Sequence, residues 1–327
     1  VVMRAMRLAE LAGPLAAELA GADCEFTGVS TDSRKLQSGD LFVALRGEHF
    51  NGHEYLPQAQ QRGACAALVS EQSETSLPLL KVADTQDALG HLGAYNRDLF
   101  DGLLVAITGS AGKTTAKNLV ASVLSRRGRT LATEGNFNNE IGVPLTLLRL
   151  APGYQFAVVE MGAARMGDIA WLCQLGRPSV ALLLNAMPAH LESFGSVERI
   201  AEAKGEIFDA LGPDGFAVIN ADQQWAARWR ERAGEATVLD FGLRTPAAIT
   251  ASEIRSAGVQ GVSFTAHTPA GDTPIRLALP GEHNVANALA TIAVGLACEL
   301  SIAEIREGLE AARPVSGRLV TTVAPLS

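Results

Sequence analysis

Short apolar runs alternate with segments of helical periodicity along most of the chain. The apolar runs predict strands at residues 103–107, 156–159, 179–184 and 216–219. Helical segments lie between them, at residues 114–126, 164–174 and 196–211. Buried strands that alternate with helices form a parallel sheet covered on both faces. We therefore predict a mostly parallel, helix-covered α/β sheet for the central part of the chain.

The first 82 residues have a mixed pattern of short strands and helices. Strands are predicted at residues 42–45 and 64–69. An amphipathic N-terminal helix is predicted from the spacing of four leucines, Leu8, Leu11, Leu15 and Leu19. A helix over residues 82–101 follows. We therefore place a small mixed α/β domain at residues 1–82.

Residues 247–280 depart from the parallel pattern. Short alternating stretches are separated there by turn residues, Gly258, Gly261, Pro269 and Gly271. This pattern predicts a small antiparallel insertion. Helical spacing returns at residues 284–298 and 302–311. We assign the central domain to residues 83–316, in a chain of 327 residues whose length fits two domains.

Composition and charge narrow the class of protein. Hydrophobic residues make up 47% of the chain and charged residues 19%, which supports a large buried core. The formal net charge is −8 and no basic block occurs, so nucleic acid is not an expected partner. No apolar run approaches the length that spans a membrane. We expect a soluble, cytoplasmic protein without membrane insertion.

One glycine-rich segment follows an apolar run and opens a helix. Glycines let a backbone turn so that several amides point at one anion, and a helix N-terminus adds positive potential. The segment predicts a phosphate-binding loop made by Gly109, Ser110, Ala111, Gly112, Lys113, Thr114 and Thr115. Lys113 can reach the β- and γ-phosphates of a nucleotide, and the Thr114 hydroxyl can bind Mg²⁺.

The spacing within this loop departs from the general phosphate-loop motif. Four residues separate the first glycine from Gly-Lys in that motif, but Gly109 and Gly112 enclose only Ser110 and Ala111. A glycine–serine turn with a solvated lysine is the alternative. The coincidence of a strand, two glycines, a lysine and two threonines favours the phosphate loop.

Two further side chains follow strands at the same predicted sheet edge. Glu160 ends the run over 156–159, and His190 lies just after the run over 179–184. Ligands bind at the carboxyl edge of open α/β sheets, so Glu160 is a candidate magnesium ligand. An ordinary strand-end carboxylate and a solvated loop histidine are the alternatives.

Lys204 occupies an apolar position of its predicted helix. It falls in the same stripe as four apolar residues, Val197, Ile200, Ile207 and Leu211. A lysine there can lay its stem along the surface and place its ammonium in water. A desolvated lysine has a lowered pKa instead, and its neutral amine can react with carbon dioxide to give an anionic carbamate.

Together these residues resemble the Mur ligase family of cell-wall peptide synthetases. The short loop Thr-Gly-x-x-Gly-Lys-Thr-Thr is that family's form of the phosphate motif, which accounts for the two missing residues. Longer runs are similar to the branch of the family that joins D-alanyl-D-alanine to UDP-N-acetylmuramoyl-tripeptide, namely residues 135–148, 188–196, 202–208 and 280–289. The resemblance extends from about residue 8 to the end of the chain.

The resemblance implies catalytic and metal-binding roles. Lys113 and Thr114 are expected to bind phosphate and magnesium, and Glu160 and His190 match magnesium-binding positions. Lys204 matches the lysine that is carbamylated in family members and helps to hold a second magnesium ion. The implied cofactors are therefore ATP and two Mg²⁺ ions.

The resemblance also implies binding residues beyond this group. Asn284 and Asn287 match the stretch near the adenine, and Arg318 matches a hinge arginine near the nucleotide. Asn138 and Asn139 are expected near the nucleotide and the muramoyl substrate. Recognition of the uridine end is expected from Ser30, Thr31, Asp32, Ser33 and Arg34. Helix-capping asparagines, a solvated linker arginine and an ordinary polar turn are the alternatives.

The implied activity is ATP-dependent peptide-bond formation by a monomer. The terminal carboxylate of UDP-N-acetylmuramoyl-tripeptide would attack the γ-phosphate of ATP, and the amine of D-alanyl-D-alanine would displace phosphate from the acyl phosphate. Magnesium and Lys113 would offset the repulsion between carboxylate and triphosphate. A sibling ligase that adds one amino acid, a folylpolyglutamate-type ligase and a non-catalytic nucleotide-binding module are the alternatives. The asparagine-rich loop at 135–142 argues against the first two.

Members of the family continue into a third domain that supplies the dipeptide site and closes over ATP. This chain ends soon after Arg318, so residues 317–327 are interpreted as the start of a linker to that domain. We accordingly expect a truncated form whose ligase activity is absent or very low.

Overall fold

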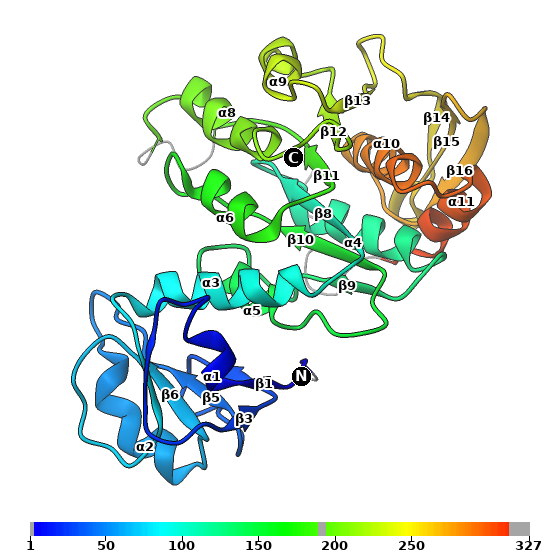
Figure 1. Ribbon diagram of the computed structural model, residues 1–327. Coiled ribbons are helices and arrows are strands. Elements are labelled where there is room, and N and C mark those ends of the chain that lie inside the picture. Colours follow the sequence, from blue (N-terminus) through cyan, green and yellow to red (C-terminus); the bar gives the residue numbers. More distant parts are fainter. Residues whose placement is uncertain (1–2, 189–193, 314–327) are drawn as a thin grey trace, which may run out of the picture.

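The computed structural model describes residues 3–188 and 194–313, which form two α/β units joined by one long helix (Figure 1). The first unit contains a five-stranded sheet. The second contains a six-stranded parallel sheet and a three-stranded antiparallel sheet. The predicted fold class is therefore confirmed. Within the described ranges, no helix is long and apolar enough to cross a bilayer.

The six-stranded sheet forms the middle of the second unit. Its strands are β8 (Leu103–Thr108), β9 (Thr130–Ala132), β10 (Phe156–Glu160), β11 (Val180–Leu183), β12 (Phe216–Asn220) and β13 (Thr237–Phe241). They lie in the order β13-β12-β11-β8-β10-β9, and every neighbouring pair is parallel. Side chains alternate between the two faces, so Val105 and Ile107 enter one core while Leu104 and Ala106 enter the other. Both cores are apolar, which explains the continuous apolar runs in the sequence.

Helices cover both faces of this sheet (Figure 1). One face carries α4 (Lys113–Leu124), α10 (Glu282–Ala297) and α11 (Ile302–Ala311). The other carries α5 (Gly142–Leu147), α6 (Asp168–Gly176), α8 (Val197–Gly205), the 3-10 helix η2 (Glu206–Phe208) and α9 (Ala226–Arg232). Each strand–helix crossover returns the chain to the same sheet edge, so the loops that follow the strands gather there.

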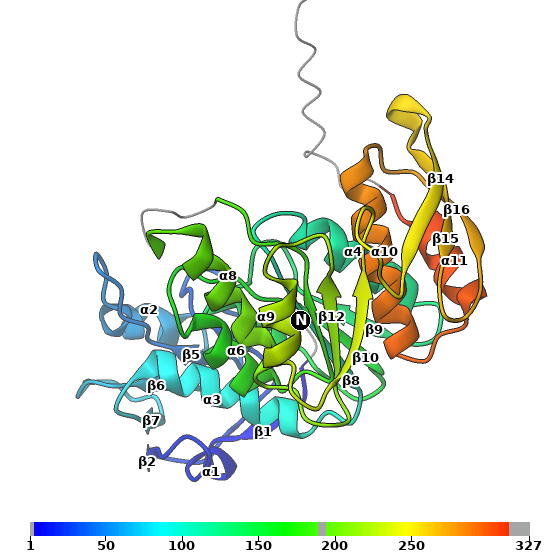
Figure 2. The same cartoon turned by 90° about the horizontal axis from the view of Figure 1, so that it is seen from above.

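The predicted antiparallel insertion is present. It consists of β14 (Thr250–Ser256), the 3-10 helix η3 (Gly258–Gln260), β15 (Val262–His267) and β16 (Thr273–Leu277). Phe264 and Ile275 point into the core shared with α10 and α11. Figure 2 shows this sheet beside α10 and α11, on the side away from the first unit.

The first unit is built on a smaller mixed sheet. Its strands are β2 (Glu18–Ala20), β4 (Val29–Ser30), β5 (Leu41–Val43), β6 (Ala66–Val69) and β7 (Leu79–Lys81). The order is β2-β7-β6-β5-β4, with β2 antiparallel to its neighbour and the other pairs parallel. The remaining elements are β1 (Met6–Arg7), α1 (Leu8–Leu11), β3 (Glu25–Phe26), η1 (Gly52–Tyr55) and α2 (Leu56–Gln61).

The prediction of one amphipathic helix through Leu19 is wrong. Helix α1 ends at Leu11, and Leu19 lies in strand β2, opposite Leu80 of β7. Pro14 disfavours helical backbone at the residue before it, and Ala16 adopts a left-handed φ of 48°. The four leucines therefore share helical spacing without sharing a helix.

Helix α3 (Thr85–Asp98) connects the two units. Leu89 and Leu92 pack in the core of the first unit. On its other side, Asn96 Nδ2 donates to the carbonyls of Leu147 at 2.8 Å and Leu150 at 2.9 Å in the second unit. Two glycines allow close approach there: a Cβ at Gly90 would lie 2.8 Å from Trp171 Cζ2, and one at Gly93 would lie 2.9 Å from Pro144 Cα. The domain limits of 82 and 316 remain predictions, and residues 317–327 lie outside the described ranges.

Candidate nucleotide site

The loop between β8 and α4 has the backbone of an anion site. Gly112 adopts a left-handed φ of 82° directly before Lys113, the first residue of α4. No side chain among residues 3–188 and 194–313 caps this helix. The amides of Gly112, Thr114 and Thr115 donate no hydrogen bond within the described part of the chain. Unpaired amides at a helix N-terminus favour a bound anion.

Side chains from three segments meet beside this loop. The Thr114 hydroxyl donates to Glu160 Oε2 at 3.1 Å, and Asn138 Nδ2 donates to Glu160 Oε1 at 2.9 Å. Glu160 is only 2% exposed and lies opposite Ile107 of β8, next to the start of the loop. Lys113 Nζ donates to Gly109 O at 2.7 Å. The predicted meeting of Glu160 with the phosphate loop is thus present.

A cavity of about 310 Å³ opens at this point. Its lining consists of Ser110, Ala111, Gly112, Lys113, Thr114, Thr115, Asn136, Asn138 and Glu160. All but Asn136 were predicted as site residues. Asn136 lies in the asparagine-rich loop. Its position two residues before the predicted Asn138 is the sequence feature that could have indicated it as a site residue.

Lys204 is buried in α8, with 4% of its surface exposed. Burial first, and then the nearby positive charge of Lys113, lower its pKa to about 8. The Nζ of Lys204 makes no hydrogen bond or ion pair with any residue that the structure describes, whereas its backbone carbonyl accepts from the Glu206 amide. At pH 7, a pKa of 8 in place of 10.5 makes the neutral amine roughly 300-fold more abundant.

Helix α10 brings an asparagine side chain against the phosphate loop. A Cβ at Gly112 would lie 3.0 Å from Asn287 Oδ1, so this side chain lies against the phosphate loop. Asn287 Nδ2 donates to Asn284 Oδ1 at 3.2 Å, and Asn284 Nδ2 donates to Pro280 O at 2.8 Å. The helix is preceded by Gly281 and has no side-chain cap, so neither asparagine acts as its N-cap.

Asn185 is a contact residue that the sequence prediction missed. It follows β11, and its side chain makes two hydrogen bonds with the peptide groups of Ala111. Its carbonyl accepts from Ser110 N at 3.0 Å, and Ser110 Oγ donates to Met187 O at 3.0 Å. A polar residue directly after an apolar strand was the signal, the same one that identified Glu160.

Other predicted residues lie elsewhere. Ser30 ends β4, and Asp32 pairs with Arg34 through Nε at 2.9 Å, which holds the pKa of Asp32 at about 2. Ser33 Oγ donates to Gln58 Oε1 at 2.5 Å, so the 30–34 segment, including Thr31, is a structured turn of the first unit. Asn139 Oδ1 accepts from Gly142 N at 2.9 Å at the start of α5. His190 and Arg318 lie outside the described residues.

The donor atoms at the cavity are those that a magnesium ion prefers. Glu160 supplies two carboxylate oxygens and Thr114 a hydroxyl oxygen, all hard ligands. Among residues 3–188 and 194–313, no cluster of three or more histidine, cysteine or acidic side chains could hold a metal by itself. A sparse oxygen set fits an ion that is completed by nucleotide phosphates and water.

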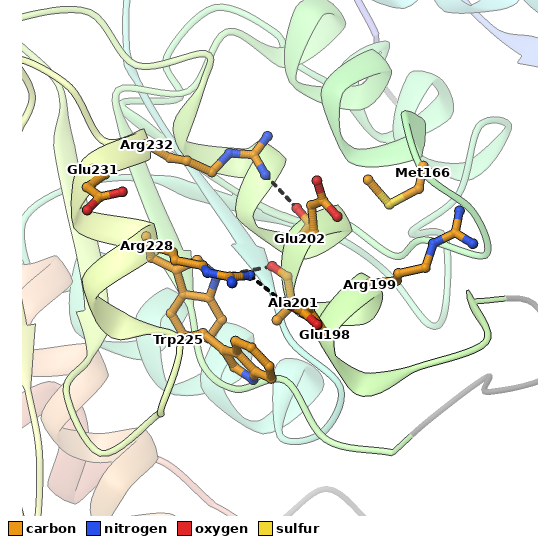
Figure 3. A pocket seen from close by; sticks show the side chains of 10 residues that line it. Met166, Glu198, Arg199, Ala201, Glu202, Trp225, Arg228, Glu231 and Arg232 are labelled. Atoms are coloured by element: carbon orange, nitrogen blue, oxygen red, sulfur yellow. Dashed lines mark hydrogen bonds and ion pairs between the residues drawn. The ribbon is translucent and has the colours of Figure 1, made fainter.

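A second cavity, of about 770 Å³, lies between α8 and α9 (Figure 3). Arg228 reaches across it to Glu198 at 2.7 Å and lies over the Trp225 ring at 5.7 Å. Arg232 Nη1 donates to the Glu202 carbonyl at 2.6 Å. None of the predicted site residues that the structure describes lines this cavity, so its larger volume does not make it the nucleotide site.

The parallel sheet, the glycine loop before α4 and the carboxylate at the next strand tip define a phosphate-loop protein of the α/β class. Residues 107–295 match the model of the Mur ligase middle domain, and residues 25–97 match that of the Mur ligase family, catalytic domain. The chain belongs to the Mur ligase family and is an enzyme of the ligase class.

Individual relatives are more specific. The chain is 45% identical to the UDP-N-acetylmuramoyl-tripeptide–D-alanyl-D-alanine ligase of Escherichia coli, over 97% of this chain and 70% of that protein. It is 34% identical to the ligase of the same name from Bacillus subtilis, over 89% of this chain and 63% of that one.

Solved structures agree with this family. MurF from Acinetobacter baumannii superimposes with a TM-score of 0.94 at 38% identity, over 98% of this chain and 71% of that one. MurF ligase from Thermotoga maritima, solved in complex with ADP, gives a TM-score of 0.79 at 29% identity, over 89% of this chain and 67% of that one.

Proposed function

We propose that this chain carries out the ATP-dependent joining of D-alanyl-D-alanine to UDP-N-acetylmuramoyl-tripeptide. One observation carries the proposal. Glu160 and Thr114 share a hydrogen bond at the N-terminus of helix α4, inside a cavity lined by the short phosphate loop. The similarity to ligases of that name supplies the two substrates.

The nucleotide would bind with its phosphates at the N-terminus of α4. The amides of Gly112, Thr114 and Thr115 are available as donors, and Lys113 would exchange its bond to Gly109 O for a phosphate oxygen. Asn287 lies against Gly112 and marks the side from which the rest of the nucleotide would approach. ADP in the similar Thermotoga maritima structure supports ATP as the nucleotide.

Thr114 and Glu160 would hold a magnesium ion, which supplies positive charge for the transferring phosphoryl group when bound. Their present hydrogen bond keeps the hydroxyl and the carboxylate within reach of one point. Asn138 keeps the second carboxylate oxygen in place through its amide. The chain's own residues thus orient the ligand oxygens before any ion arrives.

The reaction would proceed in two balanced steps. A terminal carboxylate oxygen of the tripeptide attacks the γ-phosphorus. The bond from the γ-phosphorus to the β–γ bridging oxygen breaks, ADP departs, and the tripeptide is now an acyl phosphate. The amine of D-alanyl-D-alanine then attacks the acyl carbon, the carbon–oxygen bond to phosphate breaks, and the amine loses a proton. Lys113 would act by stabilising negative charge on the transferring group.

Lys204 would carry the carbamate in this scheme. The ammonium would first lose one proton. The neutral nitrogen would then bond to the carbon of carbon dioxide and lose a second proton, so that a cation becomes an anion. Burial and the lack of a described partner both favour the neutral amine that this step needs. The carbamate would supply oxygen ligands to a second magnesium ion, together with His190, which lies outside the described residues.

The first unit would bind the uridine end of the muramoyl substrate, at the turn over residues 30–34. Asp32 and Arg34 hold each other in a bidentate pair, which leaves the hydroxyls of this turn on a fixed backbone. Asn138 and Asn139, between the cavity and α5, would lie along the muramoyl part.

Binding and turnover should be measured separately. Calorimetric titration of the 327-residue chain with Mg-ATP and with UDP-N-acetylmuramoyl-tripeptide tests the two sites. Phosphate release that requires both the tripeptide and D-alanyl-D-alanine supports the ligase, whereas release without either favours a nucleotide-binding module. Absence of Mg-ATP binding would contradict the proposal. That the chain alone turns over slowly or not at all stays a prediction of the same assay.

A further inference from the structure

Lys117 is a buried lysine that the proposed chemistry does not use. It lies in α4, one helical turn beyond Lys113, and is only 4% exposed. Its Nζ donates to Thr133 O at 2.6 Å. An ammonium is costly to bury unless it is hydrogen-bonded. The hydrogen bond to the Thr133 carbonyl therefore offsets part of the cost of burying the Lys117 ammonium.

Thr133 is the point at which strand β9 leaves the sheet. Its amide still donates to Val158 O of β10 at 3.0 Å, as in a continuing parallel ladder. In such a ladder, the carbonyl of the same residue would accept from the Glu160 amide. Here the Thr133 hydroxyl accepts from Glu160 N instead, at 2.9 Å. The Thr133 carbonyl is thereby released from the sheet and turns to Lys117.

The replacement of the Thr133 carbonyl by its hydroxyl as acceptor affects both the loop over 134–139 and the backbone of Glu160. The strand pairing ends with Ala132 opposite Val158, and the chain then enters the loop over 134–139. That loop brings Asn136 to the cavity wall and Asn138 to the Glu160 carboxylate. The Glu160 backbone, in turn, depends on the Thr133 hydroxyl.

We propose that Lys117 is a positioning residue for the nucleotide site. By holding the Thr133 carbonyl out of the ladder, Lys117 sets where the 134–139 loop leaves the sheet, and so how Glu160 and Asn138 face the cavity. Thr114 and Lys117 are three residues apart on α4 and so lie on one side of the helix, where Thr114 contacts Glu160 and Lys117 contacts Thr133. The inference rests on the proposed function of this cavity as the Mg-ATP site.

The test measures the Mg²⁺ concentration that gives half-maximal ATP binding to the 327-residue chain. Lys117→Met should raise it at least tenfold, because the oxygen ligands lose their alignment. Thr133→Val, which removes the hydroxyl acceptor of the Glu160 amide, should raise it at least threefold. Lys117→Arg, which keeps a cationic donor, should recover part of the loss.

Val120→Ala is the matched control for stability. Val120 is fully buried on α4 in the core shared with α10 and α11. Its truncation should lower the melting temperature without changing the Mg²⁺ requirement. A folded Lys117→Met chain with the wild-type requirement would overturn the inference. So would a Val120→Ala shift as large as that of Lys117→Met. If Lys117→Met does not fold, a folded Thr133→Val chain with the wild-type Mg²⁺ requirement would overturn the inference instead.

Hydrogen exchange of the ligand-free chain separates this inference from the proposed function. Backbone amides of residues 134–139 and of Glu160 should exchange at least tenfold faster in Lys117→Met than in Val120→Ala. Equal protection in the two variants would overturn the role of Lys117 even if ATP binds. Failure of the wild-type chain to bind Mg-ATP would count against the proposed function alone, and the exchange result would still decide the positioning role.

Discussion

The side chain of Asn185 makes two hydrogen bonds with the backbone of Ala111. Its Oδ1 accepts from Ala111 N at 2.9 Å, and its Nδ2 donates to Ala111 O at 3.1 Å. The Ala111 amide is therefore engaged within the protein and is not available to a phosphate. The shortened loop is thus anchored to the segment that follows the neighbouring strand β11, and this anchor fixes the amides that follow Ala111.

Removal of this anchor should weaken nucleotide binding. Asn185→Ala loses two neutral hydrogen bonds of about 1 kcal/mol each, so affinity for Mg-ATP should fall roughly 10- to 30-fold. Asn185→Asp should lose more, because it repels both the Ala111 carbonyl and the phosphates. Calorimetric titration measures both variants. Gln223→Ala is the control, since Gln223 accepts from Ala186 N and does not contact the loop. Equal affinities for wild type and Asn185→Ala would refute the anchor.

Lys113→Ala should lower affinity for Mg-ATP by about 2 kcal/mol, or roughly 30-fold, through loss of a charged hydrogen bond to phosphate. Where turnover is measurable, the loss of transition-state stabilisation should reach about 3 kcal/mol or more. The folded state should be little affected, because the Lys113 ammonium bonds a carbonyl of its own loop. Wild-type affinity in this variant would contradict the assignment of the loop.

Glu160→Gln tests the proposed metal ligand without changing its size. The amide oxygen can still accept from Thr114 or Asn138, but the negative charge is lost. The Mg²⁺ concentration for half-maximal ATP binding should rise at least tenfold, while ATP binding at saturating Mg²⁺ is partly retained. Binding titrations over a range of Mg²⁺ concentrations measure this. An unchanged Mg²⁺ requirement would remove Glu160 from the site.

Lys204→Met should make the protein more stable and less active. The residue is only 4% exposed and its ammonium is desolvated, and an apolar side chain of similar length avoids that cost. A gain of about 1 to 3 kcal/mol in the free energy of unfolding is expected. Thermal denaturation measures it. Where turnover is measurable, bicarbonate-dependent activity should disappear. A destabilised variant that still responds to bicarbonate would contradict both parts.

The first unit should lose stability below neutral pH through His53. Ser70 N donates to His53 Nε2 at 2.9 Å, and Nδ1 lies 2.7 Å from Asn51 Oδ1, so the ring is held neutral. Burial lowers its pKa below the ordinary value of 6.5. As pH falls below 6.5, the unfolded chain takes up this proton first, so the stability present above pH 6.5 is lost toward the lowered folded pKa.

Melting temperatures of wild type and His53→Gln between pH 8 and pH 5 check this dependence. The wild-type curve should fall more steeply than the variant's below about pH 6.5. Parallel curves would show that another group controls the acid response.

Much of the site could be derived from the sequence because strand ends in a parallel sheet share one edge. That rule predicts Glu160 beside the phosphate loop, and it applies equally to Asn185, whose neutral amide has no ionisable group to distinguish it from an ordinary loop residue. It could not reveal Lys117. A lysine four residues into a helix has the same sequence pattern whether it is solvated or buried, and only the departure of Thr133 from the ladder decides between them.

The prediction of one N-terminal helix through Leu19 is wrong for a related reason. Leucine spacing reports which side chains are buried, and all four leucines are at least partly covered. It does not report whether the backbone between them stays helical, which Pro14 and strand pairing with β7 decided. The uridine segment and the asparagines of α10 likewise came from family likeness, because polar residues at turns and helix starts have many ordinary uses.

The absence of side chains at Gly90 and Gly93 of α3 has a consequence for the proposed substrate, which would reach from one unit to the other. Where Gly90 and Gly93 meet the second unit, any methyl group would collide with neighbouring atoms. An alanine at Gly93 would push α3 away from the second unit. The first unit would rotate with the helix, so its atoms would move further the more distant they are from Gly93. The span between the 30–34 turn and the phosphate loop would then change by more than the displacement at Gly93 itself. Affinity for a ligand of fixed length would be lost without any change to the residues that touch it.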